Sequence, residues 1–272
     1  MKILISADIE GVAGVFHTDQ TRPGNAEYER ARLWMTQEAN AAALGAFDGG
    51  ATTVVINDSH GPFRNLLPDH LDDRIRCIQG KPRILGMMAG VESGCDAAFL
   101  VGFHSRAQGR GVLAHTISSF AFSRVVLNGK ELGEAGLYGA LAGEYGVPVV
   151  FGTGDDRFIE ENTPVLTSAS WFQTKEASGR LSGCSLTPAA SAAGIREAAR
   201  QAMGRIAQAR PFVIAPPIQC DLTTTSGAMA DLFSQLPSVE RVDGVTIRFN
   251  TESVEAAVRT LNCFSAMSAL LK

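Results

Sequence analysis

Short hydrophobic runs alternate with helix-length segments along the first half of the chain. Residues 2–7, 52–57 and 97–102 are apolar or β-branched runs, a pattern typical of strands buried in a parallel sheet. Residues 26–47 carry apolar side chains at helical spacing and end before two glycines, which predicts a helix between the first two strands. The pattern therefore predicts a β-α-β unit, whose crossover should be right-handed.

The remaining pattern predicts more elements of both kinds. We expect helices over 84–92 and 132–145, strands or a hairpin within 112–128 with Asn128-Gly129 as its turn, and a fourth parallel strand over 148–152. After residue 187 we expect helices over 189–209, 228–235 and 253–271 and strands over 212–222 and 241–250. The prediction is an α/β fold, a mostly parallel sheet flanked by helices, with a second, smaller α+β domain. The predicted catalytic domain covers residues 1–186 and the smaller domain 187–272.

Composition narrows the class of protein. The chain has 272 residues, of which 45% are hydrophobic and 19% charged, as in soluble globular proteins of one large or two modest domains. A formal net charge of -4 and a pI near 5.8 give no electrostatic reason to expect nucleic acid as a partner. Only five uncharged residues separate Lys2 from Asp8, too few for a signal peptide or a membrane span. We therefore predict a cytoplasmic protein with no membrane partner.

The cysteines do not predict a disulfide framework. They are odd in number, widely spaced and form no C-x-x-C pair, so we predict reduced, buried thiols. They are Cys77, Cys95, Cys184, Cys220 and Cys263.

Residue types that bind metals follow three of the predicted strands. Asp8 and Glu10 follow the first strand, His60 the second and His104 the third. Because the carboxyl ends of parallel strands meet at one edge of a sheet, we expect these side chains to converge. Glu134 opens a predicted helix and is a fifth candidate ligand, although an acidic residue in a first helical turn also complements the helix dipole.

Each candidate also has an ordinary structural interpretation. A carboxylate at the end of a strand is a common cap, and a single histidine is more often a hydrogen-bonded structural residue than a ligand. Two of the five histidines, however, occupy equivalent strand ends opposite the two acids. That coincidence favours a metal site over the structural interpretation.

The types of ligand indicate the metal and the chemistry. Carboxylate and imidazole without thiolate suit Zn²⁺, with Mn²⁺, Co²⁺ or Ni²⁺ as alternatives. Five ligands exceed the three that one catalytic zinc normally takes from a protein, so two metals that share a bridging carboxylate fit better. Such a pair can ionise a water and polarise a scissile carbonyl, which implies hydrolysis.

The other histidines carry weaker signals. His115 follows a glycine-rich turn away from the strand ends, and it is either an acid, base or nucleophile or a buried structural residue; both interpretations stay open. His17 and His70 are predicted to lie at the surface. No third glycine follows Gly152 and Gly154, so we predict no dinucleotide-binding loop there.

Several motifs in one order resemble peptidase family M55, the D-aminopeptidases. They are Ala7-Asp8-Ile9-Glu10-Gly11, Tyr28-Glu29-Arg30-Ala31-Arg32, Met35-Thr36-Gln37-Glu38-Ala39-Asn40, Asn57-Asp58-Ser59-His60, Gly102-Phe103-His104, Gly133-Glu134 and Gly154-Asp155-Asp156-Arg157. The likeness extends from residue 1 to about residue 160.

The resemblance implies a set of roles for the candidate residues. It implies a two-zinc site in which Asp8 bridges the metals, Glu10 and His60 bind one, and His104 and Glu134 bind the other. His115 matches the catalytic histidine of the family. The resemblance also implies removal of free amino-terminal D-residues from short peptides, and assembly into a self-compartmentalising homo-decamer.

Other functions stay open at this point. We recognise no motif after residue 160, where substrate pockets often vary, so an L-specific aminopeptidase or an amidase for another small amide is an alternative. A non-catalytic small-molecule binding protein on the same scaffold would be expected to lack a ligand or His115, and all are present. A two-metal phosphoesterase would need cationic clamps, for which Arg106 and Arg110 are the only basic residues near a strand end.

Overall fold

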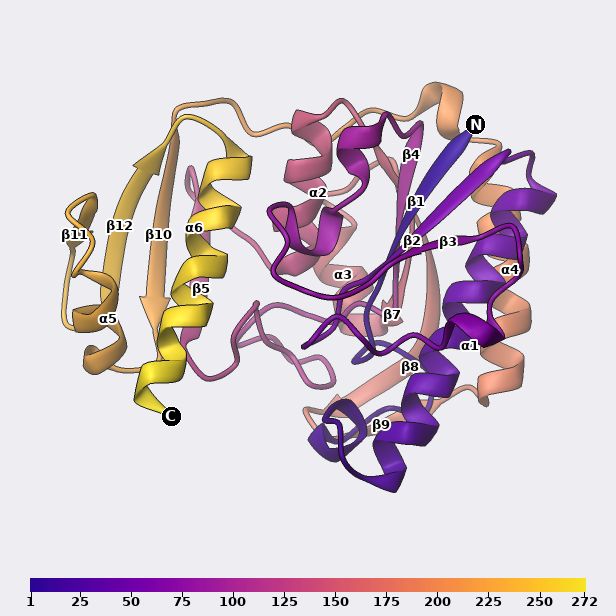
Figure 1. The fold of residues 1–272 in the computed structure, drawn as a ribbon, viewed down its shortest axis with the longest axis horizontal. Coiled ribbons are helices and arrows are strands. Elements are labelled where there is room, and N and C mark those ends of the chain that lie inside the picture. The colour runs from indigo at the N-terminus through magenta and orange to yellow at the C-terminus, as the bar shows by residue number, and fades with distance from the viewer.

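The computed structural model describes residues 1–272 and contains two sheets (Figure 1). The strands of the first sheet are β1 (Lys2–Ala7), β2 (Thr53–Asp58), β3 (Arg76–Ile78), β4 (Ala97–Val101), β7 (Val149–Asp155), β8 (Ser170–Gly179) and β9 (Ser182–Ser185). Their order is β3-β2-β1-β4-β7-β8-β9, and only β9 runs antiparallel to its neighbour. The strand β1 therefore lies between β2 and β4.

Helices cover both faces of the first sheet. The helices α1 (Ala26–Asp48) and α4 (Pro188–Met203) pack on each other and on one face, at the right of Figure 1. The helices α2 (Glu134–Glu144) and α3 (Asp156–Asn162) pack against β7, and α3 also packs against β8. Apolar residues from β1, β4, α1 and α4 form one buried cluster. Segments that are distant in sequence therefore pack together on this face of the sheet.

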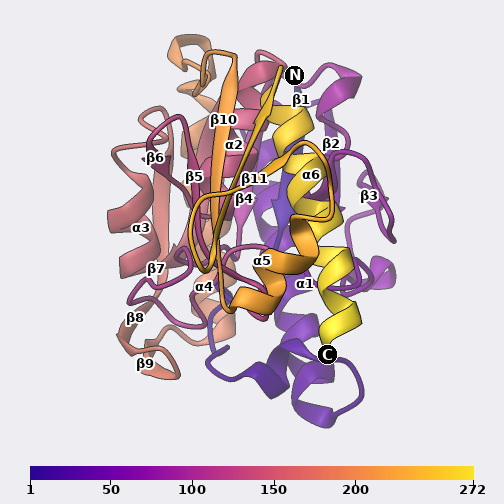
Figure 2. The same cartoon turned by 90° about the vertical axis from the view of Figure 1, so that its left-hand side faces the viewer.

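The second sheet is antiparallel throughout and stands beside α2 (Figures 1 and 2). Its strands are β5 (Phe122–Leu127), β6 (Lys130–Glu131), β10 (Ile218–Thr224), β11 (Val239–Arg241) and β12 (Thr246–Thr251), in the order β11-β12-β10-β5-β6. The helices α5 (Gly227–Phe233) and α6 (Val254–Met267) pack on it, and α6 also contacts α2. A second buried cluster joins this sheet, α6 and α2 to the first sheet.

The predicted fold class is confirmed: a mostly parallel sheet is flanked by helices and accompanied by a smaller α+β part. The predicted boundary near residue 186 does not coincide with the gap between the sheets, because β5 and β6 precede it and α4, which follows it, packs on α1. The division into domains of residues 1–186 and 187–272 stays a prediction.

Two local predictions are wrong. Residues 84–92 do not form an α-helix but two 3₁₀ turns, Gly86–Met88 and Val91–Ser93. Glycines with positive φ at positions 86, 90 and 94 break the helical path. The strand predicted from residue 212 begins only at Ile218. The hairpin turn at Asn128-Gly129 is confirmed between β5 and β6.

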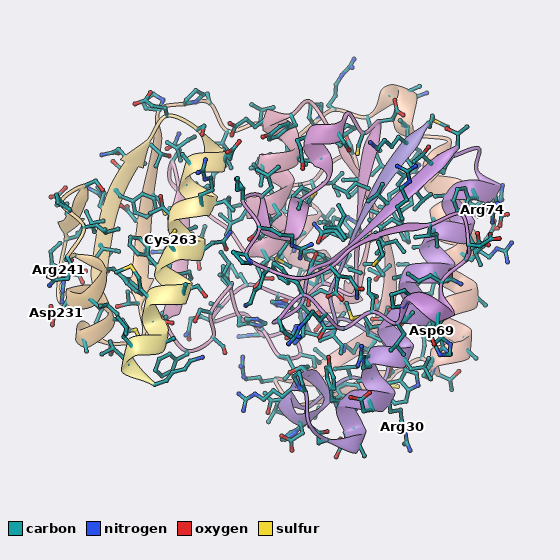
Figure 3. All side chains as sticks on the ribbon, in the orientation of Figure 1. Arg30, Asp69, Arg74, Asp231, Arg241 and Cys263 are labelled. Carbon is teal, nitrogen blue, oxygen red and sulfur yellow. The ribbon has the colours of Figure 1, made fainter.

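The thiols differ from the prediction in their exposure. No cysteine is in a disulfide, but only Cys220 is buried, while Cys184 and Cys263 are exposed. Cys263 lies on α6 (Figure 3). The prediction of buried thiols therefore holds for Cys220 alone, because Cys77 and Cys95 are only partly buried. No helix has the length and apolar character needed to cross a membrane.

A glycine permits the close approach of the segments that follow β1 and β4. Gly102 has a φ of 72°, and a Cβ atom built on it would lie 2.3 Å from the carbonyl oxygen of Asp8. The amide of Gly11 donates to the carbonyl of Gly102 at 2.7 Å. A side chain at position 102 would therefore push Asp8 out of place.

Replacing Gly102 with alanine is expected to lower the free energy of unfolding by about 3 kcal/mol, from the positive φ and the displaced Asp8 backbone together. Gly129→Ala is the matched control, because Gly129 has a φ of 79° and open space around it. That control should lose only about 1 kcal/mol. Urea unfolding measures both, and equal losses would contradict a role for the close approach.

Candidate metal centre

The strand order places the predicted ligands around Asp8. Asp8 directly follows β1, and Ala7 is in register with Asp58 of β2 on one side and Val101 of β4 on the other. His60 and His104 follow those neighbouring strands within a few residues. Adjacent strands are about 4.8 Å apart, so the two imidazoles reach Asp8 from opposite sides.

The side chains meet in two groups that share Asp8. His60 Nδ1 lies 3.2 Å from Asp8 Oδ1 and 3.0 Å from Glu10 Oε2. His104 Nε2 lies 3.4 Å from Asp8 Oδ2 and 3.5 Å from Glu134 Oε2. The two carboxylate oxygens of Asp8 thus face different histidines, and all five predicted ligands come together.

Glu134 comes to this edge from a helix and not from a strand. It is the first residue of α2, with Gly133 as the N-cap, so the positive end of the helix dipole favours its charge. The amide of Ile117 donates to its Oε1 at 2.5 Å. That contact holds one carboxylate oxygen and leaves Oε2 near His104.

In both His60 and His104, the ring nitrogen that does not face the carboxylates contacts a backbone carbonyl. His60 Nε2 lies 2.8 Å from the carbonyl oxygen of Thr21, and His104 Nδ1 lies 2.9 Å from that of Ser105. A carbonyl only accepts, so these nitrogens carry the proton. The other ring nitrogen of a neutral imidazole then turns a lone pair toward the carboxylates. Acceptors that face each other at this distance need a proton or a metal cation between them.

Two buried atoms of the cluster have no hydrogen-bond partner: Glu10 Oε2 and His104 Nε2. Donor atoms from Asp8, Glu10 and His104 lie within 4.8 Å of one another, as do donor atoms from His104, His115 and Glu134. Oxygen and nitrogen donors without sulfur are the ligands expected for Zn²⁺ in a catalytic site. The residues present therefore fit the metal that the sequence predicts.

The pKa shifts in the cluster also indicate that its buried acids need positive charge nearby. Burial would raise the pKa of Asp8, but the neighbouring imidazoles of His104 and His60 hold it well below its usual range. Burial would lower the pKa of both histidines, but Glu10 and Asp8 raise that of His60, and Glu134 and Asp8 raise that of His104, well above the ordinary value. Buried acids outnumber the histidines here, and positive charge stabilises them.

His115 stands over His104 at the edge of the cluster. The two rings stack with centroids 4.1 Å apart and an angle of 9° between their planes. His115 Nδ1 lies 2.9 Å from the carbonyl oxygen of Leu113, and its Nε2 lies 3.7 Å from Glu134 Oε1. Its Nε2 lone pair is thus presented to the centre, either as a further ligand beside His104 and Glu134 or for proton transfer. His17 and His70 are exposed, as predicted.

Sequence reasoning missed the residue that holds the Glu10 segment. Lys175 of β8 is buried, and its Nζ donates to the carbonyls of Glu10, Val12 and Val15 at 2.6, 2.9 and 2.5 Å. Burial lowers its pKa to about 8, although nearby acids oppose the shift. It lies after residue 160, where no motif signals it. Its strand, SWFQTKEASG, does not alternate between apolar and polar residues, so the local sequence does not show that this lysine is buried.

A second buried charged residue holds the same segment from the other side. Glu38 of α1 accepts from the amide of Ala13 at 3.0 Å and from Ser191 Oγ of α4 at 2.7 Å. Burial raises its pKa to about 7, which the two hydrogen bonds only partly offset. The segment after β1 is therefore held through both its carbonyls and its amides.

The cluster opens into a cavity of about 660 Å³ between the sheet edge and the end of α6. Asp8, His60, His115 and Glu134 line it on one side, and Asn262 of α6 is among the residues on the other. Arg106 and Arg110 line a different depression. The two arginines that the sequence offered as clamps for a phosphoesterase are therefore outside this cavity.

Comparison with known proteins gives consistent similarities. The model of peptidase family M55, described as D-aminopeptidase, matches residues 1–263. A D-aminopeptidase of Bacillus subtilis (strain 168) is 30% identical over 262 residues, which is 96% of this chain and 95% of that protein. A solved structure, the Zn-dependent D-aminopeptidase DppA from Bacillus subtilis, a self-compartmentalizing protease, is 27% identical. It superimposes with a TM-score of 0.95 and covers 99% of this chain and 98% of its own.

Replacing Lys175 with methionine is expected to weaken zinc binding, because the carbonyls beside Glu10 lose their donor and the segment shifts. The free energy of unfolding should also fall, by about 1–3 kcal/mol for the buried acceptors left unpaired. Zinc titration and urea unfolding measure the two effects, with Lys130→Met on exposed β6 as the control. Unchanged zinc affinity in Lys175→Met would show that the contact does not position Glu10.

Proposed function

Because the chain belongs to peptidase family M55, the D-aminopeptidases, we propose that it is a zinc-dependent aminopeptidase that removes an amino-terminal D-residue from short peptides. The observation that carries this function is the position of Asp8 between His60 and His104, with Glu10 and Glu134 at the outer sides. That arrangement offers separate oxygens of one carboxylate to two cations.

These contacts support the proposed ligand sets. Asp8, Glu10 and His60 would hold one zinc ion, and Asp8, His104 and Glu134 would hold the other. The opposite orientation of the two Asp8 oxygens supports the bridge. The carbonyls of Thr21 and Ser105 support the histidine roles, because they fix the tautomers that present lone pairs to metal.

The chain's own residues have defined tasks in the proposed reaction. Bound zinc supplies Lewis-acid polarisation of the peptide carbonyl and a water of lowered pKa. His115 is held by the carbonyl of Leu113 so that Nε2 faces the cavity, where it can accept a proton and return it to the leaving amine. The carboxylates of the cluster can hold the free amino group of the substrate.

Rival functions are distinguished by substrate. An L-specific aminopeptidase or an amidase would use the same centre, so the stereochemistry and length of the substrate decide between them. A phosphoesterase is disfavoured because the family match over residues 1–263 is to D-aminopeptidases, and because Arg106 and Arg110 lie outside the cavity. A non-catalytic binding protein is disfavoured because all five ligand types and His115 come together, and four of these six residues line one cavity.

The assembly is part of the proposal. The related structure is described as a self-compartmentalizing protease, and its fold covers almost all of this chain. We infer that this chain also forms a homo-oligomer around a shared compartment. A decamer and a cytoplasmic location stay predictions.

Removing metal with a chelator is expected to reduce hydrolysis of D-alanyl-D-alanine at least about a hundredfold, because metal polarisation and water activation are lost. Zn²⁺ or Mn²⁺ should restore it. A ninhydrin assay of released D-alanine measures the rate, with L-alanyl-L-alanine as the test of stereospecificity. Full activity in metal-free protein would contradict the proposal.

Replacing His115 with alanine is expected to lower kcat by about a hundredfold or more while zinc content stays at the wild-type value, because only proton transfer is removed. His70→Ala, at an exposed histidine, is the control. Atomic absorption after dialysis gives the zinc content beside the kinetics. Loss of zinc from His115→Ala would instead place this residue among the ligands, and a wild-type rate would remove it from the mechanism.

A further inference from the structure

Three basic side chains line the same cavity as the carboxylates. Lys81, Arg83 and Lys272 all face the cavity that contains Asp8 and Glu134, which are its only acidic lining residues. None of the three cations is in an ion pair. The lining therefore combines acids of the proposed metal centre with three cations that have no ion-pair partner, and we call the part formed by Lys81, Arg83 and Lys272 the basic end.

An aromatic ring close to the metal centre organises the basic end. Phe63 is one turn after His60, because its amide donates to the His60 carbonyl at 2.8 Å. The guanidinium carbon of Arg83 lies 4.0 Å and Lys81 Nζ lies 5.6 Å from the centre of the Phe63 ring. The amide of Gly80 also donates to the Phe63 carbonyl, which fixes the loop that carries both cations.

The three cations differ in how freely they can meet a ligand. Arg83 already donates to Asn57 Oδ1 at 2.6 Å and to the carbonyl of Asp58, so it is fixed at the end of β2. Lys81 and Lys272 are exposed and have no hydrogen-bonded partner for Nζ, and Lys272 Nζ lies 5.5 Å from the Phe120 ring. Burial lowers the pKa of Lys81, and the positive charges of Lys272 and Arg83 lower it further. An anion bound among these three cations would therefore relieve their mutual repulsion.

We propose that Lys81 and Lys272, backed by the fixed charge of Arg83, bind the carboxylate at the carboxyl end of the substrate. This inference rests on the proposed function, since it assumes that the amino end is held at the metal centre. It deepens that function by assigning the substrate class: short peptides with a free carboxyl terminus, in preference to peptide amides. The zwitterionic substrate then matches the charge division of the cavity.

The scale of the site agrees with a peptide of very few residues. One turn separates His60 from Phe63, which limits their Cα atoms to about 7 Å. An extended dipeptide also spans about 7 Å. A long peptide would carry its terminal carboxylate past the two lysines and would lose this contact. The basic end therefore selects for length as well as for charge.

Calorimetry with unreactive ligands tests the subsite directly. The probes are two D-alanyl-D-alanine analogues with a ketomethylene group in place of the scissile amide, one ending in carboxylate and one in carboxamide. The zinc-loaded wild-type protein should bind the carboxylate about tenfold more tightly. The double variant Lys81→Gln/Lys272→Gln should bind both ligands equally, and the wild-type preference should shrink as salt is raised.

Control variants and turnover complete the test. Lys130→Gln removes an exposed charge on β6, outside the cavity lining, and should keep the full preference. With D-alanyl-D-alanine, the double variant should raise KM about tenfold with little change in kcat. Equal binding of both analogues by the wild type, or an unchanged preference in a folded double variant, would overturn the subsite. Absence of turnover by the wild type would instead overturn the proposed function, while the calorimetry still decides the subsite.

Discussion

The buried carboxylate of Asp8 is the constraint on which the rest of the centre depends. It is 2% exposed and follows β1, between the two strands whose ends carry His60 and His104. A carboxylate in this position needs positive charge close by, because burial in a medium of low polarity strongly disfavours an unpaired ion. The flanking imidazoles supply that charge as protonated groups, and metal ions supply it when the imidazoles are neutral. The same contacts that keep Asp8 ionised thus make the cluster suited to a cation.

Residues from distant parts of the chain hold these groups in place. Lys175 and Glu38 hold the segment after β1 through its carbonyls and amides. The centre therefore sits in a rigid frame, which is what metal sites with fixed ligand geometry require. The cavity lies against the end of α6, so the C-terminal part of the chain contributes to the substrate site although it holds none of the proposed ligands.

The predictable part of the protein is the part encoded by local patterns. Apolar runs located β1, β2 and β4, and the residue types after them indicated which side chains meet at one edge. The contacts that could not be predicted from the sequence join residues that are far apart in the chain. The acceptors of Lys175 lie 160 to 165 residues away from it in the chain, and no spacing rule connects them. Similarly, β5 pairs with β10 from a distant segment, so the composition change near residue 187 could not show where the sheets divide.

The most direct test of the account is a crystal structure of the zinc-loaded protein with anomalous scattering measured on both sides of the zinc absorption edge. Two peaks about 3.5–4 Å apart are expected, with Asp8 between them, Glu10 and His60 on one and His104 and Glu134 on the other. A single peak, or peaks that Asp8 does not contact, would contradict it.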